Sequence, residues 1–203
     1  MTRKGTTSHV DHANTFYQIP ADGNGLPMVF LHGYGQSRTG WQSTPDGREG
    51  WADIFLKKGH PVFLVDQPRR GAAGSTVEMT KDALDADGTT YRPGEQAWYT
   101  HFRIGRVAPE RYDGSQFPAK TPMLFLFGDY IDNGPQDIMS TGFWQTVLKQ
   151  CRDFAEQYVK DGGVADVIHL PKHNIHGNSH FMFQEMNNKE IADLISEWIT
   201  KHN

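Results

Sequence analysis

The sequence of 203 residues has a single cysteine, Cys151, and no long run of apolar residues. One cysteine excludes a framework of internal disulfide bonds. A helix that crosses a bilayer needs roughly 20 predominantly apolar residues in succession, and the sequence contains no such run. The opening MTRKGTTSHVDH also lacks the apolar stretch of a secretory signal. These absences predict a cytoplasmic protein, although the mature form of an exported chain would look the same.

The sequence has little excess of either charge. Twenty Lys and Arg residues stand against 24 Asp and Glu residues, which gives a net charge of −4, and no block of basic residues occurs. Nucleic acid and anionic membrane surfaces are therefore not predicted as partners. The expected partner is a small molecule that is neutral or modestly charged. The length suits one domain over residues 1–203, which buries roughly 70% of the surface of the unfolded chain.

Short apolar segments bounded by Gly, Pro and polar residues predict β-strands, and apolar residues at helical spacing predict helices between them. The predicted strands are residues 15–19, 28–31, 61–65, 123–127 and 165–170, and the predicted helices are residues 51–59, 142–159 and 188–201. Strand, helix and strand in succession form the unit of a parallel sheet. The pattern predicts an α/β fold with a mostly parallel sheet flanked by helices. Because residues 28–31 are all apolar, we expect that strand to be covered on both faces.

A glycine-containing loop follows directly on the strand at residues 28–31. Its sequence is His32-Gly33-Tyr34-Gly35-Gln36. Glycine lets the backbone turn sharply and brings main-chain N–H groups close to a ligand. Such N–H groups stabilise negative charge on a bound group. The pattern therefore indicates a loop that holds an anion or a developing oxyanion.

This loop resembles the HGGGQ-type oxyanion loop of α/β-hydrolase esterases. Three further blocks in the same order resemble a bacterial and fungal esterase-like branch of that superfamily: TPDGREGWAD at 44–53, VDQP at 65–68 and GNSH at 177–180. The resemblance implies a shortened α/β-hydrolase fold, no cofactor, and hydrolysis of a small carboxylic ester.

The resemblance also implies roles for individual residues. His180 matches the catalytic histidine of the GNxH block and would act as the base. Asp129, which follows the strand at 123–127, would be the carboxylate that orients this base, and Asp132 is the fallback. The oxyanion and substrate-binding residues would be those of the glycine loop: Gly33, Tyr34, Gly35 and Gln36.

The nucleophile cannot be identified, because the sequence contains no G-x-S-x-G elbow on a strand-to-helix turn. The elbow is expected within residues 69–122, an irregular segment that corresponds to part of the substrate-covering insertion in the family. The passage through residues 117–122 looks like a join where elbow, helix and strand have been lost. The substitutes are weaker candidates: Ser37, Ser115, Ser179 and Cys151.

The missing elbow leaves two alternatives open. The chain could be an inactive hydrolase remnant that binds a small molecule or a protein. Another chain could also supply the missing strand and nucleophile, because a gap in the sheet would expose strand edges that favour pairing between chains into a homo-oligomer.

Four histidines lie four, three and four residues apart in the sequence, which invites comparison with metal sites. They are His169, His173, His176 and His180. A proline and a glycine between them prevent one continuous helix, so the spacing does not place them on a shared face. No cysteine or HExxH pattern accompanies them. No metal is predicted.

Overall fold

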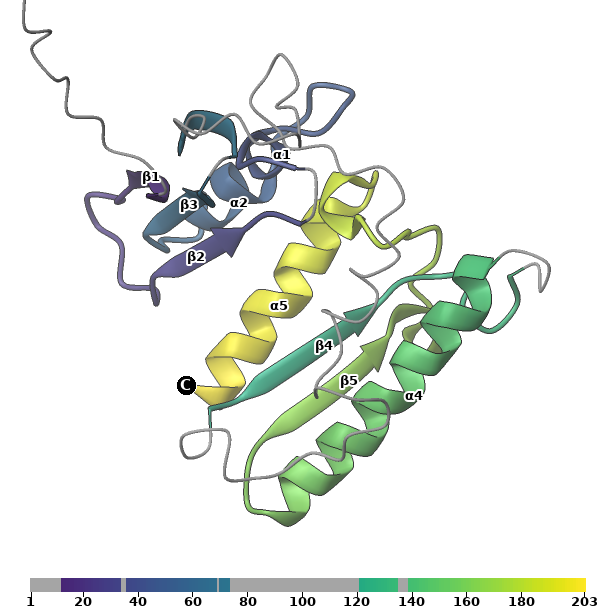
Figure 1. The fold of residues 1–203 in the computed structure, drawn as a ribbon. Coiled ribbons are helices and arrows are strands. Elements are labelled where there is room, and N and C mark those ends of the chain that lie inside the picture. Colours follow the sequence, from purple (N-terminus) through teal and green to yellow (C-terminus); the bar gives the residue numbers. More distant parts are fainter. Residues whose placement is uncertain (1–11, 34–35, 69, 74–120, 135–138) are drawn as a thin grey trace, which may run out of the picture. The chain divides into compact units, whose positions relative to one another are not determined.

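The computed structural model describes residues 12–33, 36–68, 70–73, 121–134 and 139–203 (Figure 1). These residues divide into two compact units. One comprises the described residues up to 73 together with 188–196, and the other comprises residues from 121 to 187 together with 197–203. The predictions for residues 74–120, including most of the join at 117–122, lie outside the described residues. The single domain over 1–203 stays a prediction.

The first unit contains a three-stranded sheet in the order β1-β3-β2. Its elements are β1 (Asn14–Gln18), β2 (Met28–Leu31), α1 (Thr39–Gln42), α2 (Trp51–Lys57), β3 (Val62–Asp66) and the short helix η1 (Gly71–Ala73). Strand β2 pairs in parallel with β3, whereas β1 pairs with β3 in the antiparallel sense. The predicted strand, helix and strand unit is confirmed. Gly59, the last residue of the helix predicted over 51–59, follows the end of α2 with φ of +86°, a conformation that favours glycine.

The core of the first unit lies between one face of this sheet and α2. Phe30 of β2 and Leu64 of β3 are buried there, and the ring of Phe30 lies 5.8 Å from that of Phe55 on α2. Successive side chains of a strand point to opposite faces. Val29 and Leu31 consequently point away from this core and are 63% and 57% exposed. The prediction that this strand is covered on both faces is wrong, because the apolar run reflects alternation over one buried and one exposed face.

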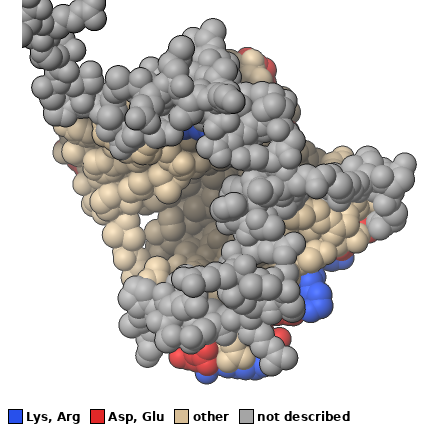
Figure 2. All heavy atoms as spheres, in the orientation of Figure 1, with Lys and Arg blue, Asp and Glu red and all other residues tan. Residues whose placement is uncertain are grey.

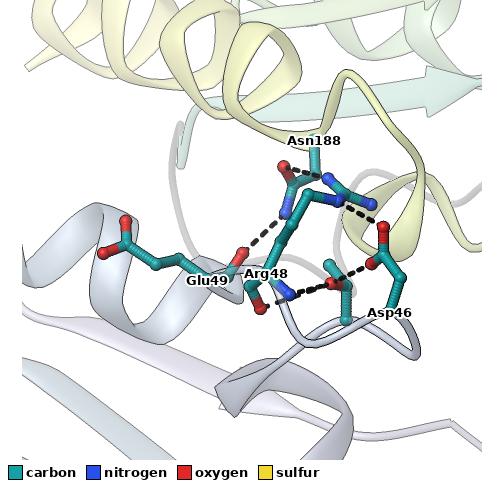
Figure 3. Close-up of polar contacts among 5 residues, drawn as sticks. Asp46, Arg48, Glu49 and Asn188 are labelled. Carbon is teal, nitrogen blue, oxygen red and sulfur yellow. Dashed lines mark hydrogen bonds and ion pairs between the residues drawn. The ribbon is translucent and has the colours of Figure 1, made fainter.

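Asn188, the first residue of α5 (Asn188–His202), ties this helix to the turn before α2 (Figure 3). Its side chain is buried, donates to the carbonyl of Glu49 at 2.9 Å, and accepts from Nη1 of Arg48 at 3.4 Å. Nε of Arg48 also pairs with the carboxylate of Asp46 at 2.7 Å. The block at 44–53, which carries part of the resemblance, therefore has a structural role in the first unit.

The second unit is built on the parallel pair β4 and β5. Its elements are β4 (Met123–Phe127), α4 (Met139–Lys160), β5 (Ala165–His169), η3 (Leu170–His173) and η4 (Met182–Gln184). Phe127, Ile131 and Leu148 form a buried cluster against which Trp144 and Cys151 pack. Burial raises the pKa of the Cys151 thiol, which makes this cysteine a poor substitute for the nucleophile.

The exposed side of α4 carries charges of both signs. Figure 2 shows Lys or Arg and Asp or Glu side chains near one another at the lower edge of the visible face. Lys149 pairs with Asp153 and Lys160 with Glu156, each within one turn of the helix. Among the described residues, no helix combines the length and the apolar character needed to cross a bilayer.

Candidate active site

The end of β4 and the loop that carries His180 are in close contact within the second unit. The backbone N–H of Asp129 donates to the carbonyl of Asn178 at 2.6 Å. A Cβ atom on Gly128 would lie 2.4 Å from that same oxygen and 2.6 Å from the carbonyl oxygen of Ser179. Only glycine leaves room for the loop to pass over the strand end at this distance. Gly128 thereby allows Asp129 and His180 to belong to one site.

Side-chain hydrogen bonds hold the remainder of this loop. Asn178 is fully buried, and its amide exchanges two hydrogen bonds with the amide of Asn187, at 2.6 and 3.0 Å. The backbone N–H and the hydroxyl of Ser179 both donate to the carboxylate of Glu185. The Ser179 hydroxyl is therefore engaged in the loop, which makes this serine a poor substitute for the nucleophile.

The carboxylate of Asp129 is held by groups of the same loop. Oδ2 accepts from the backbone N–H of Gly177 at 3.0 Å and lies 3.3 Å from Nδ1 of His176, while Oδ1 accepts from the N–H of Tyr130 at 2.9 Å. The hydrogen bond from Gly177 is the largest cause that lowers the pKa of Asp129, so the carboxylate is charged at neutral pH. Asp129 thus has a histidine partner, but that partner is His176, which no sequence pattern favoured over His180.

The His180 ring packs on aromatic side chains. Its centroid lies 4.5 Å from that of Trp144, with 31° between the planes, and Phe181 contacts it edge-on at 5.2 Å. Partial burial lowers the pKa of His180, although the residue as a whole is exposed at the surface. A neutral imidazole has a lone pair that can take a proton. Among the described residues, no hydrogen bond joins His180 to Asp129.

His180 and Asp129 line the same cavity, which has a volume of about 310 Å³. The other lining residues are glycine, apolar or aromatic: Leu124, Phe125, Leu126, Phe127, Gly128, Ile131, Trp144, Val147 and Met182. A pocket of this size, mostly apolar with a few polar groups, is typical of a small-molecule site. It runs along β4 from Leu124 and extends to Gly128 and Asp129 beyond the carboxyl end of the strand.

Asp132, the fallback acid, has a different environment. Its carboxylate forms an ion pair with Lys172 at 2.9 Å and lies 3.9 Å from Nδ1 of His169. The hydrogen bond from Lys172 is the largest cause that lowers the pKa of Asp132. His169 is buried at the end of β5, and its desolvation lowers its pKa. Asp132 does not line the cavity that contains His180.

The glycine loop belongs to the first unit, and Tyr34 and Gly35 lie outside the described residues. Gly33 and Gln36 close a turn, since the N–H of Gln36 donates to the carbonyl of Gly33 and the N–H of Gly33 donates to the Gln36 side chain, both at 3.2 Å. His32 is buried and accepts from the N–H of Gln67 at Nε2. The proton of its neutral ring is then on Nδ1, which donates to the carbonyl of Gly33 at 2.9 Å.

A buried carboxylate that sequence reasoning missed stabilises this region. Asp66, at the end of β3, is 1% exposed and accepts from the backbone N–H groups of Arg38 at 2.7 Å and Ala72 at 2.9 Å. It also lies 3.6 Å from Nε of Arg38. Asp66 therefore joins the segment after β2 to the segment after β3. Asp66 belongs to the sequence block VDQP at 65–68, and this block was the signal that could have identified it.

The histidines considered as metal ligands are not gathered by the structure into such a site. The described residues contain no group of three or more His, Cys, Asp or Glu side chains placed to hold a metal ion.

Comparison with known proteins agrees with this architecture. A solved structure described as the atomic-resolution structure of a novel bacterial esterase matches 95% of this chain and 86% of its own, with a TM-score of 0.66 and 23% identity. The chain has an α/β-hydrolase-like fold. The predicted fold class, a shortened and mostly parallel sheet flanked by helices, is confirmed.

A sequence match adds a narrower likeness. The chain is 53% identical over 45 residues to a protein named "Probable secreted lipase phiG" from a fungal species (strain ATCC 74256). The match covers 22% of this chain and 12% of that lipase, so the chain spans about an eighth of its relative. No family model matches the sequence. The relative is named as secreted, and the cytoplasmic location stays a prediction.

Proposed function

We propose that this protein is a carboxylic ester hydrolase of the α/β-hydrolase type that acts on a small ester. The single observation that carries the proposal is the cavity of about 310 Å³, where a histidine with a lowered pKa and a charged aspartate are the polar groups in an otherwise apolar lining. The likenesses to a bacterial esterase and, over a short segment, to a lipase support the same chemistry.

In this proposal His180 takes the proton of the attacking hydroxyl as that oxygen adds to the ester carbonyl, and then gives the proton to the departing alkoxide. Asp129 stabilises the imidazolium that forms. The expected oxyanion donors are the N–H groups of Tyr34 and Gly35, because the N–H of Gln36 donates to the carbonyl of Gly33. Each such donor contributes on the order of 3 kcal/mol to the transition state. The hydroxyl remains to be assigned: Ser37 and Ser179 are both engaged in hydrogen bonds, and Ser115 lies outside the described residues.

The test compares hydrolysis of a short-chain aryl ester by the wild type, His180→Ala and His176→Ala. Loss of a general base costs about 100- to 10,000-fold in rate, so we expect that loss in His180→Ala. His176→Ala is the matched control, because His176 contacts Asp129 from the same loop and does not line the cavity. Equal rates for the wild type and both variants would refute catalysis by either histidine. Loss in His176→Ala alone would transfer the role of base to His176.

A second candidate is a binding protein that retains the pocket without catalysis. It is favoured by one observation: the Asp129 carboxylate contacts His176 and Gly177 instead of His180. A serine-reactive phosphonate followed by intact mass measurement separates the two candidates. A covalent adduct on the folded protein would exclude the binding protein, and its absence together with absent ester hydrolysis would favour it.

We also propose that the chain forms a homo-oligomer. Among the described residues, β3 lies between β1 and β2, and β4 pairs only with β5, which leaves one edge each of β1, β2, β4 and β5 without a partner strand. Unpaired edges favour association between chains. Light scattering across a concentration series tests this proposal, and a monomer mass at every concentration would exclude it.

A further inference from the structure

His180 lacks the support that usually fixes a catalytic imidazole. Its loop is held by Asn178 and Ser179, yet no carboxylate among the described residues accepts a hydrogen bond from its ring. A histidine free to rotate about both side-chain bonds would occupy several positions, whereas catalysis requires placement to within about 0.5 Å. Something other than a hydrogen bond must select the position of this ring.

Trp144 provides that contact. The two ring centroids lie 4.5 Å apart with 31° between the planes, a geometry in which the indole covers much of one imidazole face. Trp144 lies on α4, a helix of 22 residues, and packs against the buried cluster of Phe127, Ile131 and Leu148. Phe143 contacts the indole from the preceding position at 5.2 Å. The indole is therefore fixed by the core, while His180 lies on a loop.

The contact also removes water from the ring. Burial is the cause that lowers the pKa of His180, and Trp144 is one of the two aromatic residues that pack on it. Among the described residues, the charged and titratable groups around this loop are Asp129, which lines the same cavity, Glu185, which contacts Ser179, and His176, which contacts Asp129. None of these three groups forms a hydrogen bond with the His180 ring among the described residues.

We propose that Trp144 is the positioning residue of the site: its indole, anchored in the core by α4, holds the imidazole of His180 against the apolar cavity. This inference rests on the proposed function for its catalytic consequence. It assigns to Trp144 the orienting role that a hydrogen-bonding carboxylate fills in other hydrolases. The residue that supports the base also forms part of the cavity wall.

The test uses the full chain with Trp144→Leu, Trp144→Phe and Val147→Ala. Two quantities are measured: the pKa of His180 by NMR titration, with its signal assigned from His180→Gln, and the pH profile of kcat/KM on a short-chain aryl ester. In Trp144→Leu we expect the pKa of His180 to rise toward its ordinary value, the acidic limb of kcat/KM to move to higher pH with it, and kcat to fall at least about 10-fold. Trp144→Phe should restore most of both quantities, because a phenyl ring can still pack on the imidazole.

Val147→Ala is the matched control. Val147 lies on the same helix and lines the same cavity, but it has no ring that packs on His180. Its truncation should change KM and leave the pKa of His180 where it is in the wild type.

An unchanged or lowered pKa of His180 in folded Trp144→Leu would overturn the proposal, since the indole would then favour the charged ring or have no effect on it. The same shift in Val147→Ala would also overturn it, because general loosening of the cavity would explain both. Absence of ester hydrolysis in the wild type would count against the proposed function alone, and the NMR titration would still decide whether Trp144 holds the ring.

Discussion

Asp66 and Asp129 are two aspartates at the carboxyl ends of parallel strands, one in each unit, and their surroundings differ. Asp66 is 1% exposed and accepts backbone N–H groups from two segments of the first unit. The Asp129 side chain is 18% exposed, lines a cavity, and bonds to groups of a single loop. An aspartate at or just after the carboxyl end of a parallel strand therefore stabilises the fold in one unit and lines a cavity in the other.

The largest expected effect comes from exchanging each aspartate for alanine. Asp66→Ala leaves the N–H groups of Arg38 and Ala72 without their acceptor, and each buried unsatisfied group costs about 1–3 kcal/mol. We expect a loss of about 2–4 kcal/mol in the free energy of unfolding, measured with urea. Asp129→Ala should cost about 1 kcal/mol or less and abolish most ester hydrolysis. Similar losses of stability in the two variants would remove the distinction between them.

A second prediction concerns the contact that brings the His180 loop to β4. Gly128→Ala would place a Cβ atom 2.4 Å from the carbonyl oxygen of Asn178, so the loop must move. We expect a loss of about 1–3 kcal/mol, as for other overpacked sites, together with a lower rate of ester hydrolysis.

Gly142→Ala provides the control for this change. Gly142 lies within α4, and a Cβ atom there would meet nothing within 4 Å. Replacing an unstrained helical glycine by alanine stabilises a protein by roughly 0.5–1 kcal/mol. Both variants are measured by urea unfolding and by the rate of ester hydrolysis. A loss of stability in Gly128→Ala together with a gain in Gly142→Ala would identify the loop contact as the cause. A Gly128→Ala variant that matched the wild type would mean that the loop is not held there.

The positions of strands and helices were predictable because they depend on apolar periodicity and on breakers such as Gly59. The identity of the partner of Asp129 was not predictable. His176 and His180 lie in the same loop, and the choice between them depends on side-chain rotamers that the sequence does not encode locally. The role of Asp66 was not predictable for a related reason. Its partners are backbone N–H groups, and almost every residue type has one, so the sequence does not mark them.

The role of Trp144, an apolar residue, was not predictable either. In a predicted amphipathic helix, a tryptophan is indistinguishable from any other core residue, and its contact with His180 joins residues far apart in the sequence. The exposure of Val29 and Leu31 was missed for a different reason. An apolar run does not indicate whether one face or both faces of a strand are packed. Sequence patterns therefore define elements, while tertiary contacts define the site.

A third prediction tests the anchoring of α5 in the first unit. Asn188→Ala removes the donor to the carbonyl of Glu49 and the acceptor for Arg48. Because the residue is only 4% exposed, water cannot easily replace these bonds. We expect a loss of about 1–2 kcal/mol in urea unfolding. Lys189→Ala, at the exposed next position, should stay within about 0.5 kcal/mol of the wild type. An equal loss in both variants would mean that the effect does not come from the network of Figure 3.

The smallest effect is expected from acid, and it returns to the accessible aspartate. The pKa of Asp129 is lowered from its ordinary value of 3.8 in the folded state, chiefly by the hydrogen bond from Gly177. Its contribution to stability is therefore fully present above that ordinary value and is lost as the pH falls through the lowered one. The loss of stability on going from pH 7 to below pH 3.8 should be smaller in Asp129→Asn than in the wild type. Because the carboxylate is partly exposed, added salt should reduce the difference further. Urea midpoints measured at the two pH values check the sign, and a steeper loss in Asp129→Asn would mean that this carboxylate opposes folding when it is charged.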